Sequence, residues 1–224
     1  MKIVVGGIKG GTGKTTLAIH LAFVGHLLGK KILLVDADEQ RSASDWADQR
    51  KTTSFPTISL MGKNIYNQIA KLEPAYDHIV IDTGGRDTTS QRSALSIADK
   101  FLIPFKPRSF DIWTLGQVKN LIEEIQIINP RLKCYYAINQ GDSKGSDNED
   151  AMSIISELPH LEKIPSIIGN RKAFSNSAAE GKTIFEMEKK DDKACLETIA
   201  LASFIYGLDS GKICIRYQTD GENI

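Results

Sequence analysis

The segment Lys9-Gly10-Gly11-Thr12-Gly13-Lys14-Thr15-Thr16 is the part of this chain from which its architecture follows. An apolar run over residues 2–8 precedes it, and residues 14–28 follow with apolar side chains at helical spacing. Glycines between a strand and a helix let backbone N–H groups turn toward a phosphate, and the helix N-terminus adds its dipole. The segment therefore predicts a phosphate-binding loop, with Lys14 on the β- and γ-phosphates and the Thr15 hydroxyl on Mg²⁺.

Short apolar runs alternate with helical patterns along the rest of the chain. We expect strands at 2–8, 31–35, 58–60, 78–81, 101–103, 134–139 and 164–168, and helices at 14–28, 42–49, 64–72, 88–97, 111–128, 147–158, 172–179 and 192–206. Ser42 or Ser44 is the expected cap of the second helix. Continuous apolar strands are typical of parallel sheets covered on both faces. The prediction is an α/β fold, a doubly wound and mostly parallel sheet with helices on both faces, forming one P-loop domain over residues 1–207. A tail, 208–224, follows with one possible strand at 212–217.

Composition excludes several classes of function. Lys plus Arg and Asp plus Glu both number 28 among 224 residues, so the formal net charge is zero and a general basic coat for nucleic acid is absent. The three cysteines are widely spaced without a CxxC pair, which argues against disulfides, zinc and iron–sulfur clusters. No apolar run is long enough for a transmembrane helix, and the N-terminus does not read as a signal peptide.

The loop departs from the strict pattern GxxxxGK[ST], because Ile8 stands where the first glycine belongs. It fits xKGGxxK[ST] at every fixed position and so resembles the deviant Walker A motif of the ParA/MinD family of P-loop ATPases, closest to the short, ParF-like ParA members. The resemblance implies that Lys9 reaches across an ATP-sandwich dimer to the partner's phosphates, as a cation placed against transition-state charge. A glycine-rich turn with two surface lysines is the alternative.

Two strands of the expected sheet end in aspartates. Asp36-Ala37-Asp38-Glu39-Gln40 follows one of them, with Glu39 where the family usually has proline, and HIVIDTGG places Asp82 at the end of another. Carboxyl ends of parallel strands are where such sheets bind ligands. By resemblance Asp36 and Asp82 join Thr15 around Mg²⁺, Asp38 positions the attacking water, and residues 83–85 form a loop that senses the γ-phosphate. An acidic helix-entry turn is the alternative for residues 36–40.

Two further sets of residues complete the expected site. In the family an Asn at the end of the YYAINQ strand reads the adenine edge, which here is Asn139; a strand-terminating turn is the alternative. Pro104 and Pro107 resemble a stretch that faces the dimer interface. Phosphate contacts need only positive charge. The resemblance assigns such contacts with non-specific DNA to Arg171, Lys172 and Lys182, with solvated helix-end cations as the alternative.

The resemblance implies an ATPase that hydrolyses ATP slowly, needs ATP and Mg²⁺, and pairs with a second copy of itself to bind DNA. A ParB-like adaptor would stimulate hydrolysis and reset the cycle, segregating plasmid or chromosomal DNA or moving other cargo. We expect such a chain to be cytoplasmic, nucleoid-associated when ATP-bound, and without a membrane partner. A MinD-like membrane-cycling ATPase is one alternative, although residues 213–224 lack a basic amphipathic helix. The other is a metabolic P-loop enzyme such as dethiobiotin synthetase, which needs neither Lys9 nor the 36–40 pattern.

Overall fold

The computed structural model describes residues 1–51, 54–107, 112–142, 146–211 and 213, with only the backbone at 112 and 113. Seven parallel strands form one sheet in the order β3-β2-β4-β1-β5-β6-β7. The strands are β1 (Lys2–Val5), β2 (Ile32–Ala37), β3 (Thr57–Ser59), β4 (His78–Thr83), β5 (Lys100–Phe105), β6 (Lys133–Gly141) and β7 (Leu161–Gly169). The predicted doubly wound α/β fold is confirmed.

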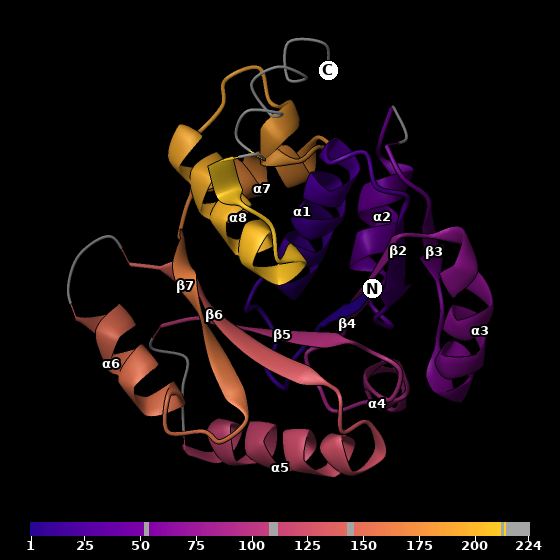
Figure 1. Ribbon diagram of the computed structural model, residues 1–224. Helices are drawn as coiled ribbons and strands as arrows, with labels where there is room; N and C mark the ends of the chain where they lie inside the picture. The colour runs from indigo at the N-terminus through magenta and orange to yellow at the C-terminus, as the bar shows by residue number, and fades with distance from the viewer. Residues whose placement is uncertain (52–53, 108–111, 143–145, 212, 214–224) are drawn as a thin grey trace.

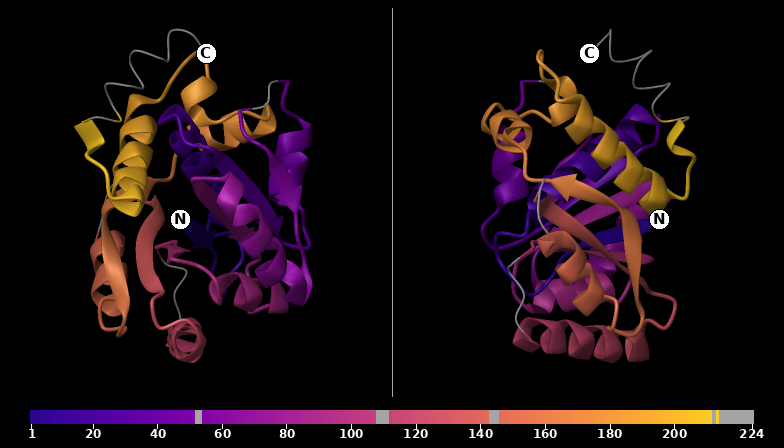
Figure 2. Two further views of the ribbon diagram at one scale, coloured as in Figure 1. Left: turned by 45° about the vertical axis from the view of Figure 1, so that its right-hand side comes forward. Right: turned by 90° about the vertical axis from the view of Figure 1, so that its left-hand side faces the viewer.

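Helices cover both faces of this sheet (Figures 1 and 2). They are α1 (Lys14–Leu27), α2 (Ser42–Asp48), α3 (Ile65–Leu72), α4 (Thr89–Leu95), α5 (Ile112–Ile128), α6 (Asp147–Ile155), α7 (Lys172–Ala179) and α8 (Asp192–Tyr206), with short 3₁₀ turns η1 (Gly62–Asn64), η2 (Glu73–Ala75) and η3 (Ile184–Glu186). One buried apolar cluster lies under α1, α2 and α8, and a second lies under α3, α4, α5 and α6. The strands between them are buried on both faces, which explains their continuous apolar runs.

The strand order reverses at β1, which predicts a crevice at the carboxyl end of this strand. From β1 the strand order runs through β4 and β2 on one side and through β5 and β6 on the other. Ligands of open α/β sheets bind outside the carboxyl ends of the strands at such a reversal. The glycine loop follows β1, Asp82 lies near the end of the adjacent β4, and Asp36 lies near the end of β2 on the other side of β4. Val5 and Asp36 both lie opposite Asp82 in the sheet register. The topology thus brings together three segments that are far apart in the sequence.

The structure corrects the predicted helix cap of α2 and the predicted start of β7. The N-cap of α2 is Arg41 in a left-handed conformation without a side-chain cap, so neither Ser42 nor Ser44 caps the helix. β7 begins three residues earlier than expected, because it lies at the sheet edge and carries exposed Glu162 and Lys163. The last strand expected in the tail, 212–217, lies outside the described residues except for position 213. Within the described ranges, no helix is long and apolar enough to cross a membrane.

Candidate functional site

A cleft of about 560 Å³ opens at the carboxyl ends of β1, β2 and β4. Its lining comes from the glycine loop and the start of α1, from the segment after β2 and from the segment after β4, and it includes Lys14, Thr15, Asp38 and Gly85. A second cleft of about 510 Å³ adjoins it across Gly13 and Thr16 and extends toward α7. The predicted phosphate-loop residues therefore line a continuous groove between two clefts.

Two glycines of the loop take left-handed conformations, with φ of 73° at Gly11 and 84° at Gly13. Side-chain-bearing residues rarely adopt these angles, so glycine is needed for the backbone to wrap the cleft. Lys14, buried at the base of the loop, donates from Nζ to the carbonyl oxygen of Lys9 at 2.9 Å. Burial lowers the pKa of Lys14, and the charges of Asp82 and Asp38 oppose that shift. The loop therefore wraps around its central cation.

The two strand-end aspartates differ in how the protein satisfies them. Asp36 Oδ2 accepts hydrogen bonds from the N–H and the hydroxyl of Ser44, both at 2.8 Å, and Oδ1 accepts one from the Asp38 N–H at 3.1 Å. Asp36 thereby caps α2 from a neighbouring strand, which is the role the sequence had given to a serine. Asp82 is fully buried, and neither of its oxygens has a hydrogen-bond partner.

This environment raises the pKa of Asp82 to about 8, chiefly through burial. The Asp36 charge raises it further, whereas the nearby Thr15 hydroxyl and Lys14 ammonium oppose the shift. A buried unpartnered carboxylate is costly unless a cation completes it. Asp82 is therefore a buried carboxyl whose ionised form a cation in the cleft would stabilise.

The donor set fits Mg²⁺. This ion takes one or two carboxylates with hydroxyl, water and substrate phosphate oxygens, and seldom uses an all-protein cage. In the described part of the chain no cluster of three or more His, Cys, Asp or Glu side chains forms such a cage. Thr15 and Asp82 would hold the ion, with Asp36 at its periphery because the protein already engages both of its oxygens. The ion would neutralise phosphate charge there.

Asp38 faces the same cleft. Its Oδ1 accepts the N–H of Gln40 at 3.1 Å, and a Cβ added to Gly84 would lie 3.1 Å from that oxygen. The carboxylate thus lies between the segments after β2 and β4, near enough to Lys14 to influence the pKa of that lysine. This location suits the predicted role in positioning water, which stays a prediction.

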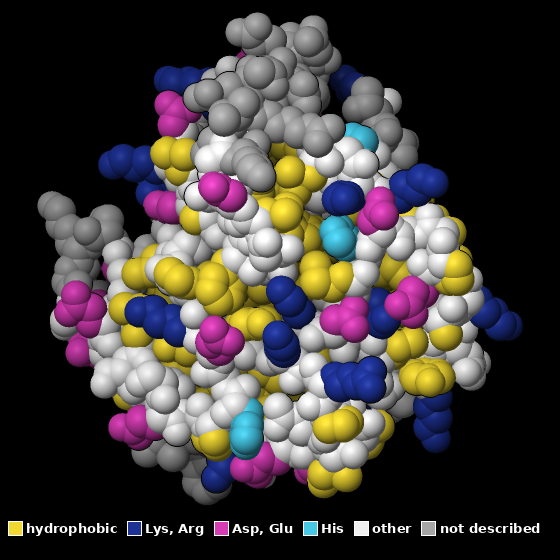
Figure 3. Space-filling model, in the orientation of Figure 1, with side chains coloured by type: hydrophobic (Ala, Val, Ile, Leu, Met, Phe, Trp, Pro, Cys, Tyr) yellow, Lys and Arg dark blue, Asp and Glu magenta, His cyan; other side chains and the backbone are white. Residues whose placement is uncertain are grey.

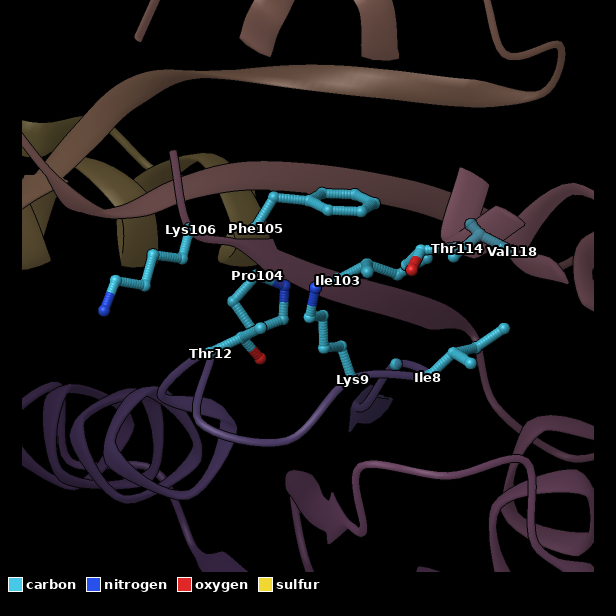
Figure 4. A pocket seen from close by; sticks show the side chains of 10 residues that line it. Ile8, Lys9, Thr12, Ile103, Pro104, Phe105, Lys106, Thr114 and Val118 are labelled. Carbon is cyan, nitrogen blue, oxygen red and sulfur yellow. The ribbon is translucent and has the colours of Figure 1, made fainter. Parts of the chain in front are cut away.

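Lys9 lies at the rim of the loop and is exposed. In Figure 4 its side chain rises from the loop toward Ile103 and Pro104 at the end of β5, with Thr12 beside it. These residues line a small pocket between the loop and the first turns of α5. Pro107 follows this segment in the chain, and residues 108–111 lie outside the described residues.

Sequence reasoning missed two residues that hold the loop. Gln91 on α4 is fully buried, and its Oε1 accepts hydrogen bonds from the Gly7 N–H at 3.0 Å and the Thr83 hydroxyl at 2.9 Å. Gln140 at the end of β6 donates from Nε2 to the Gly11 carbonyl at 3.0 Å. Gln91 belongs to no motif, and Gln140 closes the YYAINQ strand without any sequence signal for this contact. The positive φ of Gln140 (55°) is visible only in the structure.

The remaining predicted residues line or flank the second cleft. Asn139 is buried and donates from Nδ2 to the Thr12 carbonyl at 2.7 Å, so its amide N–H group faces the loop. Arg171 pairs with Glu197 at 2.5 Å and lines this cleft, and Lys182 pairs with Glu180 at 2.8 Å. Lys172 is exposed at the start of α7. Of the three cations predicted to contact DNA, Lys172 is the most accessible.

Comparisons with known proteins agree with this geometry. Residues 3–184 match the family model described as "CobQ/CobB/MinD/ParA nucleotide binding domain". The "Maintenance of carboxysome distribution protein A" of Halothiobacillus neapolitanus is 25% identical over 199 residues, which are 87% of this chain and 91% of that protein. Among solved structures, the ATP complex of a variant of Cyanothece McdA has a TM-score of 0.74 at 14% identity, covering 93% of this chain and 96% of that one. The MinC:MinD complex of Aquifex aeolicus gives 0.73 at 21% identity, covering 93% and 96%. These two likenesses show the shared fold.

Proposed function

Because the chain belongs to the CobQ/CobB/MinD/ParA family of nucleotide-binding domains, as its loop motif indicated, we propose that it is an ATP-dependent dimerising ATPase that positions cellular cargo. One observation carries this proposal. An exposed Lys9 stands at the rim of a preformed phosphate loop whose base holds Lys14 and the unpartnered Asp82. The inner groups suit a Mg²⁺-bound triphosphate, and the outer lysine lies at an exposed rim that a second subunit can reach.

Each residue then has a distinct role. Loop N–H groups and Lys14 bind the phosphates, and Asp38 orients a water toward the γ-phosphate. The Lys9 side chain turns away from the end of β5 in its own subunit and places its ammonium against the phosphates bound by the partner subunit. There it stabilises developing negative charge. Hydrolysis removes the γ-phosphate that both subunits hold, and the dimer separates. Slow hydrolysis by one chain and stimulation by a ParB-like adaptor complete the proposed cycle.

The proposed track is non-specific DNA. The net charge of zero and the mixed charges on the face in Figure 3 favour a local contact over a general basic coat. Lys172 is the main candidate, with Arg171 and Lys182 as weaker ones because their charges are shared with Glu197 and Glu180. The likeness to a carboxysome-distribution protein adds a second kind of cargo to plasmid or chromosomal DNA. We place the protein in the cytoplasm, on the nucleoid when ATP-bound.

The deciding experiment measures mass by light scattering with Mg²⁺ and a non-hydrolysable ATP analogue. Wild-type protein should double in mass with the analogue and remain single with ADP. Lys9→Ala should bind the analogue yet stay monomeric, whereas Lys71→Ala, an exposed lysine on α3, should dimerise normally. A dimeric Lys9→Ala would refute the role given to Lys9, and a monomeric wild type would refute the proposed function.

The same dimer tests the track. Random duplex DNA should bind only the analogue-loaded protein, with affinity falling as salt rises, and Lys172→Ala should weaken binding equally for all sequences. Anionic vesicles replace DNA in a parallel titration. Binding to vesicles without DNA binding would favour the MinD-like alternative instead.

A further inference from the structure

Two consecutive amide side chains at the end of β6 donate hydrogen bonds to backbone carbonyls of the phosphate loop. Asn139 Nδ2 donates to the Thr12 carbonyl at 2.7 Å and Gln140 Nε2 donates to the Gly11 carbonyl at 3.0 Å. Successive residues of a regular strand point to opposite faces, so both reaching one loop requires a distortion. The pairing of β6 with β7 is irregular between Asn139 and Gly141, and Gln140 has a φ of 55°.

That conformation of Gln140 is a left-handed one that non-glycine residues seldom adopt. Strain of this kind persists where surrounding contacts determine it, and it gathers at functional sites. Here the strained backbone directs the amide toward the Gly11 carbonyl. The unusual backbone conformation of Gln140 therefore allows its side chain to contact the loop.

Holding these carbonyls fixes the neighbouring N–H groups. In a trans peptide the C=O and the following N–H point in opposite directions. Gln140 on the Gly11 oxygen therefore orients the N–H of Thr12, and Asn139 on the Thr12 oxygen orients the N–H of Gly13. Lys14 on the Lys9 oxygen does the same for the N–H of Gly10. Contacts to the carbonyls of Lys9, Gly11 and Thr12 thus turn the N–H groups that follow them away from the donating side chains.

The packing around Gly13 fits the same arrangement. A Cβ at Gly13 would lie 2.2 Å from Asn139 Nδ2, and Gly13 itself has a φ of 84°. The Asn139 amide therefore occupies the space that any side chain at this position would need. The amide orientation follows from its partner, since a carbonyl oxygen accepts only from the NH₂ end of Asn139.

We propose that Gln140, with Asn139, is a positioning pair that orients the phosphate-loop N–H groups before a nucleotide arrives. This inference deepens the proposed function but depends only on its nucleotide-binding step, with no need for dimerisation or hydrolysis. It also adds a second role to the one expected for Asn139, because one N–H of its amide contacts the loop backbone while the amide has a second N–H and a carbonyl oxygen that can contact a base edge. The pair acts on any ligand with phosphates in the loop, whatever its base.

The test titrates nucleotide-free protein with Mg-ADP and Mg-GDP by calorimetry. Gln140→Met keeps the side-chain length and the backbone strain but removes the donor, and Gln140→Gly removes the donor and the strain together. Asn170→Ala is the matched control, because Asn170 lines the same cleft while its side chain contacts no loop carbonyl. Loss of one neutral hydrogen bond corresponds to roughly a fivefold loss of affinity.

The expected result is a loss of about fivefold for both nucleotides in both Gln140 variants, an unchanged ADP-to-GDP affinity ratio, and no change in Asn170→Ala. Inorganic pyrophosphate, which offers the loop two phosphates and no base, should lose affinity by the same factor in Gln140→Met, an effect that general destabilisation of a protein that stays folded does not produce. Wild-type affinities in Gln140→Met, a lost preference for ADP, or no nucleotide binding by the wild type would each overturn the inference. Normal ADP binding by a wild type that never dimerises would leave this inference in place and refute only the proposed cycle.

Discussion

Gly85 is the position where a single methyl group should disable the phosphate loop. A Cβ added there would lie 2.8 Å from both Cα and N of Gly10 and 2.9 Å from the carbonyl carbon of Lys9. All three are backbone atoms of the loop, so no side-chain rotation relieves the contact. Ordinary contact for such an atom begins at 3.4 Å. Gly85→Ala therefore requires the segment after β4 and the loop to separate by about 0.6 Å.

The energetic consequence follows from this displacement. Adding a methyl group to a closely packed site costs about 1 to 3 kcal/mol. If the loop moves to relieve the contact, its N–H groups leave the positions that bind phosphate, and the same energy appears as a loss of affinity of about 5- to 150-fold. Gly85 has no left-handed φ, so alanine introduces no backbone strain that would confuse the interpretation.

Calorimetry with Mg-ADP measures this loss, and thermal unfolding reports the fold. Gly116→Ala is the control, since a Cβ at this position on α5 meets no atom within 4 Å. It should leave affinity unchanged and raise the unfolding temperature slightly, because alanine favours a helix by up to about 1 kcal/mol over glycine. Wild-type ADP affinity in folded Gly85→Ala would show that the loop does not depend on this contact.

Three other variants probe stability. The buried His20 has its pKa lowered to about 4 by desolvation, so the folded state resists a proton that the unfolded state accepts near 6.5. The contribution of neutral His20 to the free energy of unfolding is fully present above pH 6.5, and about 3 kcal/mol should be lost as the pH falls from 6.5 to 4. In urea titrations the free energy of unfolding of His20→Asn should therefore depend less on pH than that of His160→Asn, which replaces an exposed histidine. Asp82→Asn should raise the unfolding temperature of nucleotide-free protein, because it removes a buried, unpartnered carboxyl, and should abolish the extra stabilisation that Mg²⁺ adds to ADP. Arg50→Ala should lower the free energy of unfolding by about 3 to 5 kcal/mol by denaturant titration, since its ion pair is buried; Arg92→Ala, in a half-exposed pair, should cost under about 1 kcal/mol.

The sequence was sufficient for the fold because each strand signals itself locally. A strand such as β2 is buried on both faces and reads as an unbroken apolar run, and the loop after β1 carries its own pattern of glycines. The edge strand β7 is predicted least well, since its exposed face carries charged residues. Local patterns therefore identify interior elements better than peripheral ones.

The site was predicted as a set of residues but not as a set of contacts. Lys14 and Asp82 follow from motifs, whereas the Gln140 contact with Gly11 joins residues 129 positions apart. Ser44 looked like a helix cap by local rules, yet it donates to Asp36 on a neighbouring strand. The Gln140 contact depends on the irregular end of β6, and the Ser44 contact depends on how the turn between β2 and α2 folds back; no local pattern reports either one. Side chains that orient other groups are therefore harder to predict than the groups they orient.

The loop's rigidity has a consequence for how nucleotide binding and dimerisation connect. Amides from β6 hold its middle, Gly85 packs against its start, and Lys14 donates to the Lys9 carbonyl. An ammonium group has three N–H donors, so Lys14 can bind a phosphate oxygen while it still donates to the Lys9 carbonyl. The backbone that carries Lys9 therefore stays in place when a phosphate enters the loop. We expect nucleotide binding to present the Lys9 side chain to a partner from a fixed rim, without a change of fold.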